Sequence, residues 1–226
     1  LNAQQIRIVE RSYDEMVRDG ANLSPENKAK LVAMNAKLEG LFSSFSSKLL
    51  GDEKLYTFVT DKAELAGLEP GFVASLASAA EANGKPGQWA IKNTRSSAQP
   101  VLQNATNRAL REKVWRAFVS RGDNGNVNDT NATIAEILKL RQQRAELLGF
   151  ATHANYRMAD TMAKTPENAM GLMMKVWPAA VARAKEEVAD MQAIADADAK
   201  AGKGPKLTIE PWDYRFYSEK VRKAKY

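Results

Sequence analysis

Hydrophobic side chains recur every three or four residues along most of the chain, which is the spacing of one face of an α-helix. The stripe that precedes Gly20 consists of Ile6, Val9, Tyr13 and Met16. A longer stripe follows the cap and first-turn proline at Ser24-Pro25 and runs to Gly51; it consists of Leu31, Met34, Leu38, Phe42, Phe45 and Leu49. We therefore predict one helix that ends at Gly20 and a much longer one that ends at Gly51.

Residues 55–60 interrupt this helical spacing. The segment is β-branched and aromatic and is bounded by charged residues, which predicts a short strand, and residues 89–92 offer a partner strand. Between them, Glu69-Pro70-Gly71 opens a helical pattern that stops at Asn83-Gly84. We predict a two-stranded ribbon with a helix inserted between its strands.

Helical spacing resumes after Pro100. One predicted helix ends at Gly122 and carries Leu110, Val114 and Phe118 on one face. The next predicted helix ends at Gly149, and a short one is predicted at residues 153–158.

A second long helix is predicted from Thr165-Pro166 onward, with a kink at Pro178. Its expected buried side consists of Met170, Met173, Trp177, Val181, Val188, Met191 and Ile194. After a flexible break at residues 201–205, Asp213 is a candidate cap for a last helix. The pattern predicts a mostly α fold, with long antiparallel helices and a small two-stranded β-ribbon, and no change of composition marks a domain boundary within residues 1–226.

Composition limits the chemistry that is open to the chain. Its 226 residues, 44% of them hydrophobic, suffice for a core, and no run approaches the roughly 20 apolar residues of a membrane span. The absence of cysteine excludes disulfides, cysteine-ligated zinc, iron–sulfur clusters and thiol nucleophiles. Because His153 is the only histidine, no site that needs two imidazoles fits within this chain.

The chain carries a formal net charge of +6, which permits binding to nucleic acid without establishing it. Most of its cations alternate with carboxylates. The exception is a C-terminal group that consists of Arg215, Lys220, Arg222, Lys223 and Lys225. We interpret this group as a solvated helix face; the alternative is an autonomous helical module whose basic last helix contacts nucleic acid or a protein partner.

Several patterns suggest chemistry but have a simpler structural interpretation. His153 has no nucleophile or orienting carboxylate near it in sequence, and the pair Glu186/Asp190 lies among alternating surface charges. A calcium loop that began at Asp123 would need Gly and Glu where Asn128 and Ile134 stand. Met170, Met173 and Met174 are interpreted as core residues of the long helix, and Trp115, Trp177 and Trp212 are interpreted as core or interface residues. We therefore predict no catalytic, cofactor-binding or metal-ligating residue in the chain.

Five runs in register carry a family resemblance. They are residues 107–113, 128–130, 147–150, 159–167 and 211–214. In order and spacing they resemble the peptidyl-dipeptidase Dcp branch of the thimet oligopeptidase family, and the resemblance extends from Leu1 to Tyr226.

The resemblance implies a neurolysin-like, mostly helical zinc metallopeptidase with a deep channel that admits short peptides. In that family a His–Glu-x-x-His helix and a downstream glutamate hold the zinc, and none of these positions has a match here, so residues 1–226 correspond to a single non-catalytic helical portion that precedes the zinc-binding helix. Since Leu1 is not an initiator methionine, we expect the chain to be an excerpt.

The resemblance also implies what surrounds the chain. The parent enzyme is expected to release dipeptides from short peptides, while this portion, which holds no zinc, forms part of the channel wall and is inactive alone. Its expected partner is the missing catalytic portion, with self-association if apolar faces are left uncovered. We expect no membrane association, no nucleic-acid partner and a cytoplasmic location, with the periplasm as the alternative.

Overall fold

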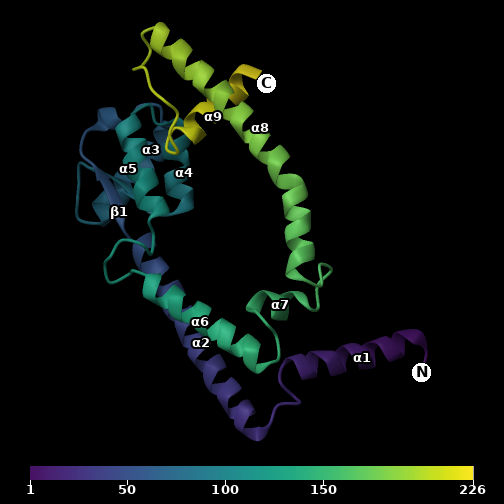
Figure 1. The fold of residues 1–226 in the computed structure, drawn as a ribbon. Helices are drawn as coiled ribbons and strands as arrows, with labels where there is room; N and C mark the ends of the chain where they lie inside the picture. The colour runs from purple at the N-terminus through teal and green to yellow at the C-terminus, as the bar shows by residue number, and fades with distance from the viewer. Residues whose placement is uncertain (226) are drawn as a thin grey trace. The chain divides into compact units, whose positions relative to one another are not determined.

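The computed structural model describes residues 1–225, which form helices and one two-stranded antiparallel sheet (Figure 1). The mostly α fold predicted from the hydrophobic spacing is thereby confirmed. The elements in chain order are α1 (Ala3–Arg18), α2 (Pro25–Glu53), β1 (Tyr56–Val59), a short 3-10 helix (Lys62–Leu65), α3 (Pro70–Ala82), β2 (Trp89–Lys92), α4 (Arg95–Asn104), α5 (Arg108–Val119), α6 (Asn131–Leu147), α7 (His153–Met158), α8 (Pro166–Lys200) and α9 (Tyr214–Lys225). Within the described residues, no helix is both long and apolar enough to cross a bilayer.

The chain divides into two compact units. Unit 1 comprises Leu1–Ser47 and Thr130–Val176, and unit 2 comprises Lys48–Asp129 and Trp177–Tyr226. Each of the long helices α2 and α8 is divided between the units, with its first part in unit 1 and its second part in unit 2 for both helices.

Unit 1 has a core between α2 and α6. Leu38 packs against Ile137 and Leu140, and Met34 and Leu41 flank them. Lys37 also forms an ion pair with Glu136. The two helices pack antiparallel: Lys37 pairs with Glu136, whereas the earlier residue Asn35 accepts a hydrogen bond from the later residue Arg144.

Unit 2 has its main core around the β-ribbon. The strands pair from Tyr56 opposite Lys92 to Val59 opposite Trp89, and α3 lies between them in the chain, as predicted. A two-stranded ribbon alone is marginally stable, so its burial against helices is what stabilises it. The buried residues of this core are Val59, Leu65, Leu68, Leu76, Ile91, Ala98, Val101, Leu102, Ala105, Leu110 and Val114.

Gly67 lets two segments of this core approach each other closely. Its backbone is left-handed (φ +89°), and a Cβ at this position would lie 2.2 Å from the carbonyl oxygen of Asn104. The neighbouring Ala66 carbonyl accepts a hydrogen bond from the Thr106 amide at 2.9 Å. Only glycine fits both the conformation and the contact.

A second cluster in unit 2 joins the end of α8 to α9. Its buried members are Met191, Ala195 and Tyr217, and Leu207 and Ile209 of the connecting segment pack against it. Two sequence predictions of burial hold here, since Met191 is buried and Ile194 packs against it.

The predicted buried side of α8 is wrong for much of the helix. Met170 and Met173 are each 52% exposed, Trp177 is 62% exposed, and Val188 is also exposed. The spacing correctly identifies an apolar face, but it does not reveal whether the elements that cover the face belong to the same chain. The interpretation of Met170, Met173 and Met174 as core residues is likewise wrong within this chain.

One helix start was also misplaced. Helix α4 begins at Arg95, before Pro100, whereas the sequence predicted helix only after that proline. A proline inside a helix removes one backbone hydrogen bond. Burial of Ala98, Val101 and Leu102 on the same helix offsets that loss.

Candidate functional site

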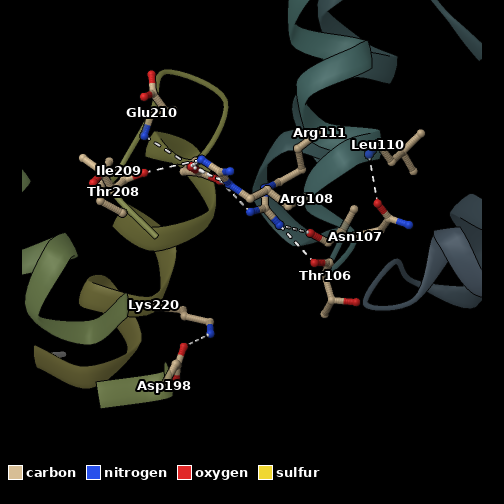
Figure 2. Close-up of polar contacts among 12 residues, drawn as sticks. Thr106, Asn107, Arg108, Leu110, Arg111, Asp198, Thr208, Ile209, Glu210 and Lys220 are labelled. Carbon is tan, nitrogen blue, oxygen red and sulfur yellow. Dashed lines mark hydrogen bonds and ion pairs between the residues drawn. The ribbon is translucent and has the colours of Figure 1, made fainter. Parts of the chain in front are cut away.

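A buried polar cluster lies in unit 2, where the start of α5 meets the segment before α9 (Figure 2). Asn107 caps α5 by accepting a hydrogen bond from the Leu110 amide at 3.0 Å. Because Arg108 and Arg111 stand three residues apart in the first turn, both side chains reach the same side of the helix. Their shared partner is Asp213, directly before α9.

The carboxylate of Asp213 is surrounded by donors. Arg108 donates to its Oδ2 from Nε at 3.0 Å and from Nη2 at 2.8 Å, and Arg111 donates from Nη2 to Oδ1 at 2.7 Å. The backbone amide of Glu210 also donates to Oδ2, at 3.2 Å. Arg111 makes a further hydrogen bond from Nη1 to the carbonyl oxygen of Ala105 at 2.8 Å. Both carboxylate oxygens are therefore engaged, as in strong bidentate pairs.

Burial and charge act in opposite directions on this group. Asp213 is 0% exposed, and burial alone would raise its pKa. The hydrogen bonds from Arg108 and Arg111 outweigh burial and hold the pKa of Asp213 below its usual value, while the pKa of Arg108 is raised by its hydrogen bonds to Asp213. Asp213 therefore stays ionised and paired at neutral pH, which suits a structural clamp rather than an acid–base catalyst.

Two tryptophans pack beside the cluster of Arg108, Arg111 and Asp213, which we call the clamp. The rings of Trp115 and Trp212 meet edge to face, with their centroids 5.7 Å apart. The guanidinium groups of Arg108 and Arg116 lie 5.6 Å and 4.9 Å from the centre of the Trp212 ring. The interpretation of Trp115 and Trp212 as packing residues agrees with this arrangement.

A second buried carboxylate organises the loop between α5 and α6. Asp52 of α2 is 0% exposed and accepts hydrogen bonds from the Gly122 amide at 2.8 Å, Asn124 Nδ2 at 2.9 Å and Asn128 Nδ2 at 2.8 Å. Burial raises the pKa of Asp52, but these hydrogen bonds outweigh it and lower the pKa below its usual value. The polar loop thus closes on a protein carboxylate.

His153 begins α7 in unit 1, where the sequence predicted a short helix. Burial lowers its pKa, and the nearby positive charges of Arg141, Arg144 and Arg157 lower it further, so the ring is neutral at pH 7. Its Nδ1 is buried and has no hydrogen-bond partner among residues 1–225. In the described part of the chain, the charged groups that shift its pKa are all arginines, which favours a structural role over that of a general base.

The remaining charged candidates are held in ion pairs. Glu186 pairs with Arg183, and Asp190 pairs with Lys225. Lys220 pairs with Asp198, and Glu219 binds Arg222 and Lys223, which lowers the pKa of Glu219 to about 2. Much of the basic charge on α9 is thereby neutralised within the protein, so binding to nucleic acid is not favoured.

The buried clamp and the Asp52 cluster were not anticipated from the sequence. Asp213 was expected only as a helix cap; its carbonyl does accept the Tyr217 amide at 3.0 Å, but its side chain binds the two arginines. A signal was nevertheless present, because Arg108 and Arg111 belong to the run 107–113 and Asp213 belongs to the run 211–214.

Comparisons of the sequence with known proteins identify a matching family and several relatives. The model of Peptidase family M3 matches residues 101–226, more than half of the chain and both runs of the clamp. The dipeptidyl carboxypeptidase of Escherichia coli strain K12 is 38% identical over the whole chain, and the probable cytosolic oligopeptidase A of Arabidopsis thaliana is 36% identical. Oligopeptidase A of Escherichia coli strain K12 is 29% identical.

The alignments cover 100% of this chain but 33%, 32% and 33% of these three relatives, so the chain spans about a third of their length. The resemblance derived from the five sequence runs is thereby confirmed. The chain belongs to Peptidase family M3.

Proposed function

We propose that the chain is a non-catalytic helical part of a zinc-dependent oligopeptidase and forms part of the wall of its substrate channel. The whole protein would release dipeptides from the C-termini of short peptides, in the cytoplasm. The observation that carries this proposal is the match of residues 101–226 to Peptidase family M3, together with a relative named dipeptidyl carboxypeptidase.

The donor set of this chain does not fit a catalytic zinc. Such a site takes three protein ligands, drawn mainly from histidine and carboxylates. The single histidine, His153, lies among arginines, and within the described residues no group of three His, Asp or Glu side chains is placed to hold a metal. We therefore assign the zinc chemistry to another part of the protein and derive no catalytic step here.

The clamp and the Asp52 cluster support a scaffold role. Asp213 ties α5 to the segment before α9, and Asp52 ties the end of α2 to the loop between α5 and α6. Both groups are ionised, buried and saturated with donors. Such networks stiffen the part of the fold that contains them, and stiffness is what a size-selective channel requires.

Apolar faces left uncovered within the chain supply the contact surface for the rest of the protein. On the first half of α8, the exposed apolar residues are Met170, Leu172, Met173, Met174, Val176 and Trp177; on α1 they are Ile6, Ile8, Val9, Tyr13 and Met16. The relatives contain about twice as many residues outside the aligned region as within it. We propose that the catalytic portion of the same protein covers these faces.

Cysteine labelling tests this proposal cleanly, because the chain has no native cysteine. Met173→Cys places a thiol in the apolar stripe, and Lys175→Cys, a control, places one at an exposed position two residues further along α8. Each variant is made in residues 1–226 and in a full-length protein that contains them. The rate of reaction with a charged maleimide is then measured.

We expect Met173→Cys to react readily in the chain alone and at least about tenfold more slowly in the longer protein, because burial excludes the reagent. Lys175→Cys should react at similar rates in both. Equal rates for Met173→Cys in the two proteins, with the longer protein active on a short peptide, would contradict the proposed covering.

A further inference from the structure

Unit 1 contains a cavity of about 360 Å³ between α1 and the segments that flank α7. Leu148 and Phe150 line part of it, and α1 supplies the opposite side. The volume lies within the range of small-molecule sites and is ample for an oxyanion such as phosphate or a carboxylate group.

Positive groups converge on this cavity. They are Arg7, Arg11, Arg18 and Lys164. The Nε of Arg18 is buried and has no hydrogen-bond partner among residues 1–225. A buried donor that lacks an acceptor is costly, so a small rearrangement of Arg18 that gave this group an acceptor would be favourable.

The carboxylate already present satisfies these donors poorly. One oxygen of Asp160 lies 3.5 Å from Nη2 of Arg11 and 3.6 Å from Nη1 of Arg18. Both distances exceed the roughly 2.7–2.9 Å of a good guanidinium–carboxylate hydrogen bond. Arg11 is in addition shared with Glu15, at 3.2 Å. Asp160 therefore acts as a loosely held internal anion.

The backbone at Lys164 is strained in a way that accompanies binding sites. Lys164 lines the same cavity and has φ +66°, the one left-handed conformation found at a non-glycine position in residues 1–225. Strain of this kind persists only where the surroundings hold it, and it concentrates at functional positions. Three carboxylates line the cavity: Asp160, and Asp14 and Glu15 of α1. The four cations therefore outnumber them.

We propose that this cavity binds an oxyanion, a phosphate or a carboxylate group, through the guanidinium groups of Arg11 and Arg18 and the ammonium group of Lys164. Asp160 competes with the ligand for the two arginines. The guanidinium fork matches both ligand groups, because each presents paired oxygens. This site goes beyond the proposed peptidase function and does not depend on it.

Isothermal titration calorimetry of residues 1–226 with sodium phosphate at low ionic strength tests the site. Asp160→Asn removes the internal competitor and should tighten binding about tenfold, the effect of one hydrogen bond to a charged group. The double variant Arg11→Gln/Arg18→Gln should weaken binding at least about tenfold. Arg183→Gln, which removes the same charge from an exposed ion pair of unit 2, should leave binding unchanged.

A second arm identifies the source of the oxyanion. A short peptide with a free C-terminal carboxylate and its amidated form compete separately against phosphate in the Asp160→Asn variant. Competition by the free acid alone assigns the site to a peptide carboxylate, and competition by neither assigns it to phosphate.

Two results would overturn the proposal. The first is that Asp160→Asn, folded as judged by circular dichroism, fails to bind phosphate. The second is that the double arginine variant binds phosphate as tightly as the unmodified chain. Because Asp160→Asn is close to isosteric, it keeps the test valid even if the double variant folds poorly.

Discussion

Removal of the Asp213 carboxylate should destabilise unit 2 strongly. Asp213→Ala leaves Arg111, which is 2% exposed, without its counter-charge. Breaking a buried ion pair by removing one partner costs about 3–5 kcal/mol. Arg108 is partly exposed and regains water, so we assign no further cost to it.

Urea denaturation followed by tryptophan fluorescence measures this effect. Trp115 and Trp212 pack against each other beside the clamp and report on its integrity. With a slope of roughly 2 kcal/mol per molar urea, the expected loss lowers the midpoint by about 2 M. Glu112→Ala is the matched control; it removes an exposed carboxylate paired with Arg116 and should cost less than about 1 kcal/mol.

A double variant separates the stabilisation contributed by the ion pair from the cost of leaving one buried charge without its partner. Arg111→Met/Asp213→Leu removes both buried charges and should be markedly more stable than Asp213→Ala. A loss below about 1 kcal/mol in Asp213→Ala, or equal losses in the single and double variants, would refute the reasoning that Arg111 is left uncompensated.

Gly67→Ala and Gly84→Ala both place alanine at positive φ, which costs about 1–2 kcal/mol each. Of these two positions only Gly67 lacks space for a Cβ, so thermal melts should show a distinctly larger loss of stability for Gly67→Ala. Equal losses of stability would contradict the close approach of Gly67 to Asn104. The folded-state pKa values of Asp52 and Asp213 are lowered, so their contributions to the free energy of unfolding are present above the unfolded-state pKa, about 3.9, and are lost as pH falls through the folded-state values. The double variant Asp52→Asn/Asp213→Asn should therefore flatten the fall of the urea midpoint below about pH 4. An unchanged dependence of the midpoint on pH would count against this prediction. Light scattering should show concentration-dependent self-association that Met173→Glu/Trp177→Glu reduces, whereas a clean monomer at high concentration would argue against exposed apolar faces as contact surfaces.

The sequence was most informative where local chemistry decides the structure. The cap and proline before α2, the β-branched run of β1 and the glycine after α6 act within a few residues, and the elements form as predicted. The insertion of α3 between the strands followed from the same local signals.

The sequence was less informative where distant residues decide the structure. Arg111 and Asp213 are 102 positions apart, and spacing rules do not relate residues at such a separation. The face of α8 that carries Met170 and Met173 shows the same limit, since periodicity gives the face but not its partner. The cavity formed by α1 and the segment around Asp160 was equally beyond local patterns, because it depends on how separate segments pack.

Zinc content and peptidase activity of residues 1–226 test the central claim most directly. The chain is purified in the presence of zinc, its metal content is determined by elemental analysis, and it is assayed on a short fluorogenic peptide beside the full-length protein. We predict no stoichiometric zinc and no cleavage by the chain, and both in the longer protein. Stoichiometric zinc in residues 1–226, with cleavage that survives repurification and is abolished by a chelator, would contradict the account.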